Sequence, residues 1–118
     1  MKPSKKSVLV VGDVMLDKWV YLRSVRTSPE TDVPIVRLVE EFTEVGGAGN
    51  ALRHLVNLST GRHQFIGVIG HDSSGQNLLE ASKSIKANAQ FVVDDKRETT
   101  VKERYFLDSV PIFRHDRR

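Results

Sequence analysis

Two aspartates, Asp13 and Asp17, follow a short apolar run, Ser7–Gly12, that is rich in valine. Such a continuous run predicts a buried strand, most simply a central strand of a parallel sheet. Open α/β sheets bind ligands at the C-terminal ends of their strands, so both carboxylates stand where a polar ligand would bind. Their i, i+4 spacing predicts that a turn, rather than a strand, presents them. A strand-ending aspartate followed by a solvated one remains an equal alternative.

A second candidate site is the glycine-rich segment Val45–Asn50, which reads Val-Gly-Gly-Ala-Gly-Asn. Glycine adopts positive φ without penalty, so this composition favours a tight backbone turn. Asn50 occupies the expected N-cap of a helix that continues with apolar residues at helical spacing to Leu58, and Gly61 is expected to end it. Backbone N–H groups at such a turn can receive polar ligand atoms. A tight turn with an ordinary cap is the alternative interpretation.

Alternating strand and helix patterns surround these candidates and predict an α/β fold. Asp72 or Ser73 is the expected N-cap of the second helix. The expected parallel strands are Ser7–Gly12, Gln64–Gly70 and Ala89–Val93, and the expected helices begin near Asn50 and span Gln76–Lys86.

Two further segments, 18–44 and 99–115, have the alternation of β-hairpins. Thr27–Asp32 supplies the first turn and Asp108-Ser109 the second. Pro34 lacks an N–H, which favours a strand start or a sheet edge. We expect the two hairpins to form one small four-stranded sheet with apolar faces that need a partner surface.

Composition limits the class of protein. The 118 residues carry a net charge of +3, which is too small and scattered for a nucleic-acid-binding surface. No apolar run reaches the roughly 20 residues that span a membrane, and the basic start does not lead into a signal peptide. The absence of cysteine excludes disulfides and agrees with a cytoplasmic location.

Five motifs occur in an order that resembles the N-terminal portion of ribokinase-like, phosphofructokinase B-type carbohydrate kinases. Within them the chain is most similar to the heptose 7-phosphate kinases of ADP-heptose synthesis for lipopolysaccharide, because of its Ser28–Pro34 segment and the Lys102-x-Arg104 pair. The motifs are Val10–Asp17, Thr27–Val36, Gly46–Asn50, Gly67–Asp72, and Lys102–Arg104 with Arg114–Asp116.

This resemblance implies roles for the candidate residues. The hairpins would form a lid over a sugar phosphate, and paired lids would make a homodimer or join a partner chain. Arginine and lysine suit phosphate, although a solvated hairpin face remains an equal alternative for the basic residues. The implied substrate-binding residues are Asp17 with its neighbour Asp13, then Gly46, Gly47 and Asn50 for the sugar, and Lys102, Arg104 and Arg114 for its phosphate.

The resemblance also implies ATP and Mg²⁺ for full-length members of the family. Their catalytic Asp, in a Gly-Ala-Gly-Asp segment, and their nucleotide-binding loops have no counterpart in these 118 residues. We therefore expect one partial, incomplete ribokinase-like three-layer domain over 1–118, with a β-sheet lid. We expect no catalytic residue, cofactor or metal site in it. It is either the sugar-binding and lid portion of such a kinase or a non-catalytic module that dimerises through its lid strands.

Overall fold

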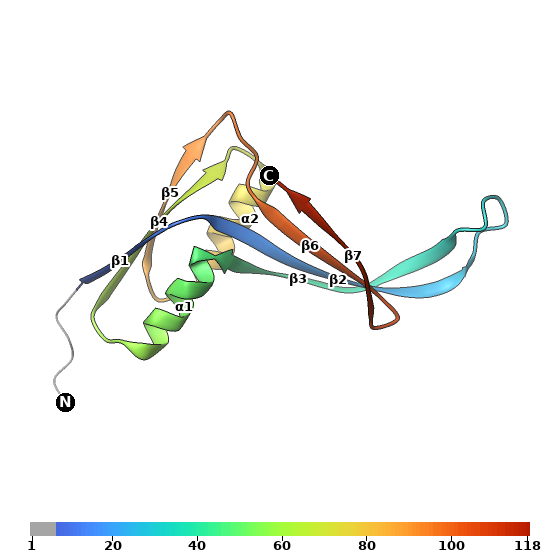
Figure 1. Cartoon of the computed structure of the whole chain (residues 1–118), viewed down its shortest axis with the longest axis horizontal. Coiled ribbons are helices and arrows are strands. Elements are labelled where there is room, and N and C mark those ends of the chain that lie inside the picture. The colour runs from blue at the N-terminus through green and yellow to red at the C-terminus, as the bar shows by residue number, and fades with distance from the viewer. Residues whose placement is uncertain (1–6) are drawn as a thin grey trace.

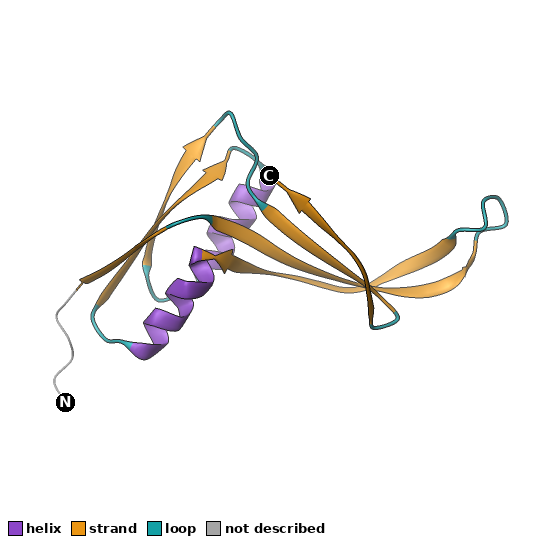
Figure 2. Cartoon of the chain, in the orientation of Figure 1, coloured by secondary structure: helices purple, strands orange, loops and turns teal. Residues whose placement is uncertain are grey.

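The computed structural model describes residues 7–118, which form a three-stranded parallel sheet, a four-stranded mixed sheet and two helices (Figures 1 and 2). The α/β class and the order of elements agree with the sequence prediction. The basic residues 1–6 lie outside the described part. The elements are β1 (Ser7–Val11), β2 (Val14–Thr27), β3 (Pro34–Gly47), α1 (Ala48–Leu58), β4 (Arg62–Gly70), α2 (Ser73–Ser82), β5 (Asn88–Asp94), β6 (Val101–Leu107) and β7 (Val110–Arg117).

The parallel sheet has the strand order β1-β4-β5. Buried and exposed residues alternate along β4, with Phe65 and Ile69 buried and Val68 exposed, because the helices cover only one of its faces. The expectation that Ser7–Gly12 is a central, buried strand is wrong for the described residues. β1 pairs only with β4 among them, and Leu9 and Val11 are exposed on the uncovered face.

One core joins the two sheets. Leu52 of α1 and Leu78 of α2 are fully buried against Phe65 of β4. The same cluster includes residues at the bases of the hairpin strands, namely Val14, Leu16, Val45 and Val101. Burial of these side chains fixes the base of the second sheet on the helical layer.

The mixed sheet has the strand order β3-β2-β6-β7, which confirms the two predicted hairpins and their association. Its inner strands β2 and β6 run parallel. β3 begins at Pro34 on the sheet edge, as predicted. Asp108 and Ser109 have φ of 48° and 70°, which is the backbone of a two-residue hairpin turn.

The first hairpin is longer than its sequence pattern predicted. β2 pairs with β3 from Val14 to Thr27, so Asp17 lies within a strand. The prediction that a turn presents Asp17 is therefore wrong. The antiparallel ladder continues back to Gly47, which leaves only Gly12 and Asp13 between β1 and β2.

The helix starts also differ in part. Gly47, with φ 61°, is the N-cap of α1, so Asn50 lies inside the helix and its predicted capping role is wrong. This difference arises because β3 continues to Gly47, whose backbone conformation favours glycine. α1 ends at Leu58 and Ser59 is its C-cap, so Gly61 does not end the helix as predicted. Asp72, one of the two predicted candidates, caps α2 and accepts a hydrogen bond from Gly75 N, although the helix begins at Ser73 rather than at Gln76.

The described residues make a thin, elongated body of 65 × 38 × 17 Å. Its radius of gyration, 18.1 Å, exceeds the roughly 13.5 Å of a compact domain of this length. The β2–β3 hairpin causes much of the extension, because it continues past Leu22, where its pairing with β6 ends (Figure 1). Neither helix in the described region is long and apolar enough to cross a membrane.

Candidate functional site at the base of the hairpin sheet

The base of the β2–β3 hairpin brings four predicted residues together. Asp13 follows β1, and its backbone oxygen accepts a hydrogen bond of 2.8 Å from Ala48 N at the start of α1. A Cβ on Gly47 would lie 2.5 Å from the same oxygen, so this close approach requires glycine. The structure thus assigns a backbone role to Asp13, while its side chain is exposed.

Asp17 lies against Gly46 on the neighbouring strand. A Cβ on Gly46 would overlap the Asp17 carboxylate, although the residue directly paired with Asp17 is Glu44. Gly46 is buried and the Asp17 side chain retains 18% of its exposure. The glycine therefore leaves space for a carboxylate that is still accessible from solvent.

Arg104 approaches this carboxylate from β6. Its Nη1 lies 3.2 Å from Asp17 Oδ1, across 87 residues of sequence. The guanidinium also lies over Trp19, 4.9 Å from the ring centroid, which is a cation–π distance. Asp17 and Arg104 thus form a part-buried pair of opposite charges on an aromatic support.

The other two basic candidates are placed differently. Lys102 pairs in register with Asp17, and no ion pair of Lys102 is found among the described residues. Arg114 lies on the edge strand β7 and is held by Asp116, with Nε to Oδ1 at 2.9 Å and Nη2 to Oδ2 at 3.0 Å. The structure therefore brings Lys102 and Arg104 beside Asp17, and Arg114 is the cross-strand neighbour of Arg104, with its guanidinium bound to Asp116.

Asn50 meets a residue that sequence reasoning missed, Arg53. Arg53 Nη1 lies 3.4 Å from Asn50 Oδ1 and 3.7 Å from Glu44, the cross-strand neighbour of Asp17, and Nη2 donates to Val45 O at 2.7 Å. Asn50 is thus linked to the Asp17 region through Arg53 rather than by a direct contact. The i, i+3 spacing of Asn50 and Arg53 on a predicted helix was the available signal.

Aromatic rings extend the face that carries Asp17 and Arg104. Trp19 stacks on Phe42 at 5.0 Å, Tyr21 lies 6.1 Å from Phe42, and Tyr21 stacks on Phe106 at 4.8 Å. The i, i+2 spacing of Asp17, Trp19 and Tyr21 puts all three on one face of β2. The charged pair is therefore bordered by an aromatic row along the hairpin sheet.

The opposite face of this sheet has its own charged cluster around the buried Glu103. Glu103 accepts hydrogen bonds from Tyr105 Oη at 2.9 Å and Arg117 Nε at 3.1 Å, and His115 Nδ1 lies 3.3 Å away. Desolvation raises the pKa of Glu103, but the Tyr105 hydrogen bond and the nearby Arg117 and Lys18 lower it more, so its pKa is below the ordinary value. The pKa of Tyr105 is raised by desolvation and by its bond to Glu103.

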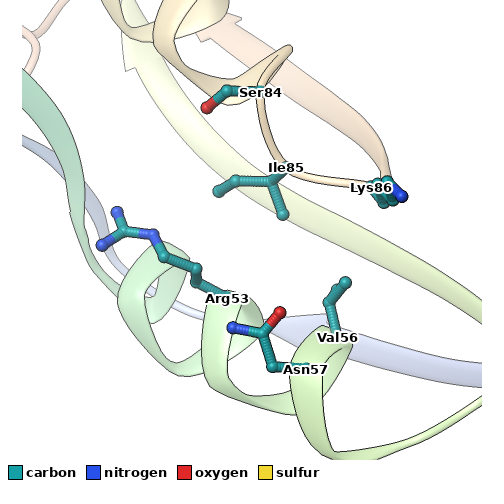
Figure 3. Close-up of a pocket in the computed structure, with 6 residues that line it drawn as sticks. All are labelled: Arg53, Val56, Asn57, Ser84, Ile85 and Lys86. Carbon is teal, nitrogen blue, oxygen red and sulfur yellow. The ribbon is translucent and has the colours of Figure 1, made fainter.

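The larger cavities do not coincide with these aspartates. One of about 380 Å³ lies between α1 and the segment after α2, and Figure 3 shows Ile85 of that segment pointing toward α1. Within residues 7–118, no group of three or more His, Cys, Asp or Glu side chains is arranged to hold a metal ion. The cavity is lined by Arg53, Val56, Asn57, Ser84, Ile85 and Lys86.

The chain is similar in sequence to known proteins. No protein-family model matches the chain. It is 43% identical over 115 residues to the bifunctional protein HldE of Caulobacter sp. (strain K31), covering 97% of this chain and 23% of that protein. It is 41% identical over 110 residues to the HldE of Rhodospirillum rubrum, covering 92% and 22%. The chain thus spans about a quarter of the length of these curated relatives.

Solved structures show the same fold at lower identity. A carbohydrate kinase from Agrobacterium tumefaciens matches with a TM-score of 0.71 and 21% identity, over 94% of this chain and 35% of that one. Ribokinase from Giardia lamblia matches with a TM-score of 0.60 and 16% identity, over 96% and 36%.

Proposed function

We propose that this chain, which is homologous to the N-terminal part of bifunctional HldE proteins and has a partial ribokinase-like carbohydrate-kinase fold, is the sugar-binding and lid portion of a heptose 7-phosphate kinase. The reaction would transfer the γ-phosphoryl group of ATP to a sugar phosphate in ADP-heptose synthesis for lipopolysaccharide. A cytoplasmic location follows from this use of ATP. The observation that carries the proposal is the Asp17 carboxylate held between Gly46 and Arg104.

The side chains around Asp17 have the chemistry needed to bind a phosphorylated sugar. A carboxylate accepts hydrogen bonds from vicinal hydroxyls, and an adjacent glycine lets the sugar approach the backbone. Arg104 and the neighbouring Lys102 supply positive charge for a phosphate, and the guanidinium can bind it with two hydrogen bonds. Substrate binding would then place the sugar across the base of the hairpin sheet.

Phosphoryl transfer requires ATP, a metal ion and the acceptor hydroxyl to be positioned together. The described residues do not offer a side-chain cluster that fits Mg²⁺. The residues of this chain would bind and orient the acceptor sugar. The nucleotide-binding groups would come from polypeptide beyond these 118 residues or from another chain.

Titration calorimetry with heptose 7-phosphate tests the proposal. Asp17→Asn keeps the shape of the side chain but removes its charge, and we expect it to weaken binding by about 1–3 kcal/mol. Asp95→Asn is the matched control, because that side chain is 83% exposed and lies outside the site. Equal affinity of both variants and the unsubstituted chain would contradict the proposal.

A second candidate function, a non-catalytic module that dimerises through the hairpin sheet, is favoured by one observation. The distal β2–β3 hairpin exposes Val25, Val36, Leu38 and Val39 where no described element covers it. Isolated two-stranded hairpins are marginally stable in water, so this region gains stability from a partner. Dimerisation is compatible with the kinase role. A chain that dimerises but does not bind the sugar would favour the non-catalytic module over the kinase portion.

A further inference from the structure

The loop that enters β6 is tied to the end of β4 by one carboxylate, that of Asp72. Its Oδ1 accepts hydrogen bonds from Gly75 N at 2.8 Å and from Thr99 Oγ1 at 2.6 Å, and its Oδ2 accepts one from Thr99 N at 2.9 Å. The Thr99 hydroxyl also accepts a hydrogen bond of 2.9 Å from Gly70 N. Asp72 and Thr99 therefore bind each other twice and also join Gly70, Gly75 and the intervening turn.

An ordinary N-cap does not require this arrangement. A capping side chain needs one oxygen for the N–H of the second or third helical residue, which Asp72 supplies to Gly75. The second oxygen of Asp72 instead binds a residue 27 positions later in the chain. The carboxylate thus joins two elements as well as capping a helix.

The surroundings of this joint are closely packed. Thr99 is 2% exposed. A Cβ on Gly70 would overlap Arg97 O, and a Cβ on Gly75 would lie 2.6 Å from Gly70 O and 3.0 Å from Thr99 Oγ1. Neither glycine has space for a side chain. The backbone at the end of β4 therefore packs directly against the start of α2 and against the loop that enters β6.

The joint lies directly before the strand that carries the basic residues. Thr100 O accepts a hydrogen bond of 2.9 Å from Leu16 N, and β6 begins at Val101. β6 then pairs with β2 from Leu16 onward, which places Lys102 beside Asp17. A displacement at Thr99 would therefore move the start of the strand that supplies Lys102 and Arg104.

We propose that Asp72 and Thr99 are positioning residues, which together fix how the β6–β7 hairpin leaves the parallel sheet and hence where Lys102 and Arg104 stand relative to Asp17. The joint makes no contact with the proposed sugar site and acts through the start of β6. Its consequence for sugar binding rests on the proposed function, whereas its effect on the orientation of the hairpin does not.

Electron-spin distance measurements test the joint without any sugar. The chain has no cysteine, so spin labels at His54→Cys on α1 and Val110→Cys on β7, both exposed, report only the distance between helix and hairpin. Thr99→Val removes the hydroxyl at nearly constant shape, and Thr99→Ser is the matched control that retains it. We expect a broader or shifted distance distribution for Thr99→Val and the original distribution for Thr99→Ser.

Urea unfolding of each variant separates orientation from general loss of stability. If Thr99→Val does not fold, Asp72→Asn takes its place. The asparagine keeps one oxygen for Gly75 N and the Thr99 hydroxyl, whereas its NH2 group replaces the acceptor of Thr99 N with a second donor. Distance distributions unchanged in the folded variant, with or without a lower unfolding midpoint, would overturn the proposal. A normal hairpin orientation in Thr99→Val or Asp72→Asn would reject the positioning role of Asp72 and Thr99. If Asp17→Asn weakens sugar binding in the same set of experiments, the proposed function remains intact.

Discussion

The Asp17 carboxylate on β2 occupies the space where a side chain on Gly46 of β3 would stand. Gly46→Ala therefore forces the carboxylate or the strand to move, and we expect a loss of about 1–3 kcal/mol in the free energy of unfolding, typical of overpacking. Urea unfolding measures this loss. The double substitution Gly46→Ala with Asp17→Ala should recover part of it, because the shorter side chain vacates the overlapping volume. Equal stability of Gly46→Ala and the unsubstituted chain would contradict this contact.

The 118-residue chain should not phosphorylate heptose 7-phosphate by itself. It contains no Gly-Ala-Gly-Asp segment, and transfer requires nucleotide and acceptor in one site. A coupled assay of ADP release with ATP and Mg²⁺ measures this. Sugar-dependent turnover that disappears in Asp17→Ala would show that the catalytic groups are present after all.

The exposed hairpin sheet should produce a dimer or another complex. Leu38 is 51% exposed on β3, and we expect Leu38→Glu to shift sedimentation toward the monomer, because a charge would replace apolar surface that the proposed dimer buries. Leu58→Glu is the matched control on α1, where the side chain is 84% exposed and distant from the hairpin tip. A strictly monomeric unsubstituted chain at high micromolar concentration would reject this prediction.

Two hydrogen-bonded carboxylates, those of Asp72 and Glu103, predict acid sensitivity. Desolvation raises the pKa of Asp72, but hydrogen bonds from Thr99 and Gly75 lower it below the ordinary 3.8, and the pKa of Glu103 is likewise below 4.5. Both carboxylates have a lower pKa in the folded state than in the unfolded state. The stability that they contribute is therefore fully present at a pH above their unfolded-state pKa, and it is lost as the pH falls through their folded-state pKa. Urea midpoints should therefore drop between about pH 5 and about pH 3.

Glu103→Gln should reduce this pH dependence, since the amide does not titrate. Glu80→Gln is a suitable control, because that side chain is 72% exposed and pairs only with Lys83 in the described structure. An identical pH dependence in Glu103→Gln and the unsubstituted chain would contradict the role assigned to Glu103.

Features set by local chemistry could be predicted from the sequence. Pro34 at an edge, the Asp108-Ser109 turn and the Asp72 cap each depend on backbone preferences of one or two residues. The N-cap assignment of Asn50 failed because strand pairing carried β3 as far as Gly47. Pairing between distant segments overrode the local preference there.

Long-range contacts were the part that the sequence did not specify. The resemblance to sugar kinases grouped Asp17 with Arg104, but the ion pair between them depends on the parallel pairing of β2 with β6. Likewise, nothing local to Thr99 indicates its two bonds to Asp72. The apolar run Ser7–Gly12 suggested a central strand, yet only one face of β1 is covered by described residues. An apolar run predicts a strand whose faces can be buried, but it does not identify the element that covers each face.

The central claim is that a phosphorylated sugar binds at the base of the hairpin sheet. Amide chemical-shift mapping of the isotope-labelled 118-residue chain during titration with heptose 7-phosphate tests it most directly. The account predicts that saturable shifts cluster at Asp17, Gly46, Gly47 and the β6 residues Lys102 and Arg104, and that Asp17→Asn needs a higher sugar concentration to reach them. Absence of saturable shifts there, or shifts confined to the cavity between α1 and the segment after α2, would contradict it.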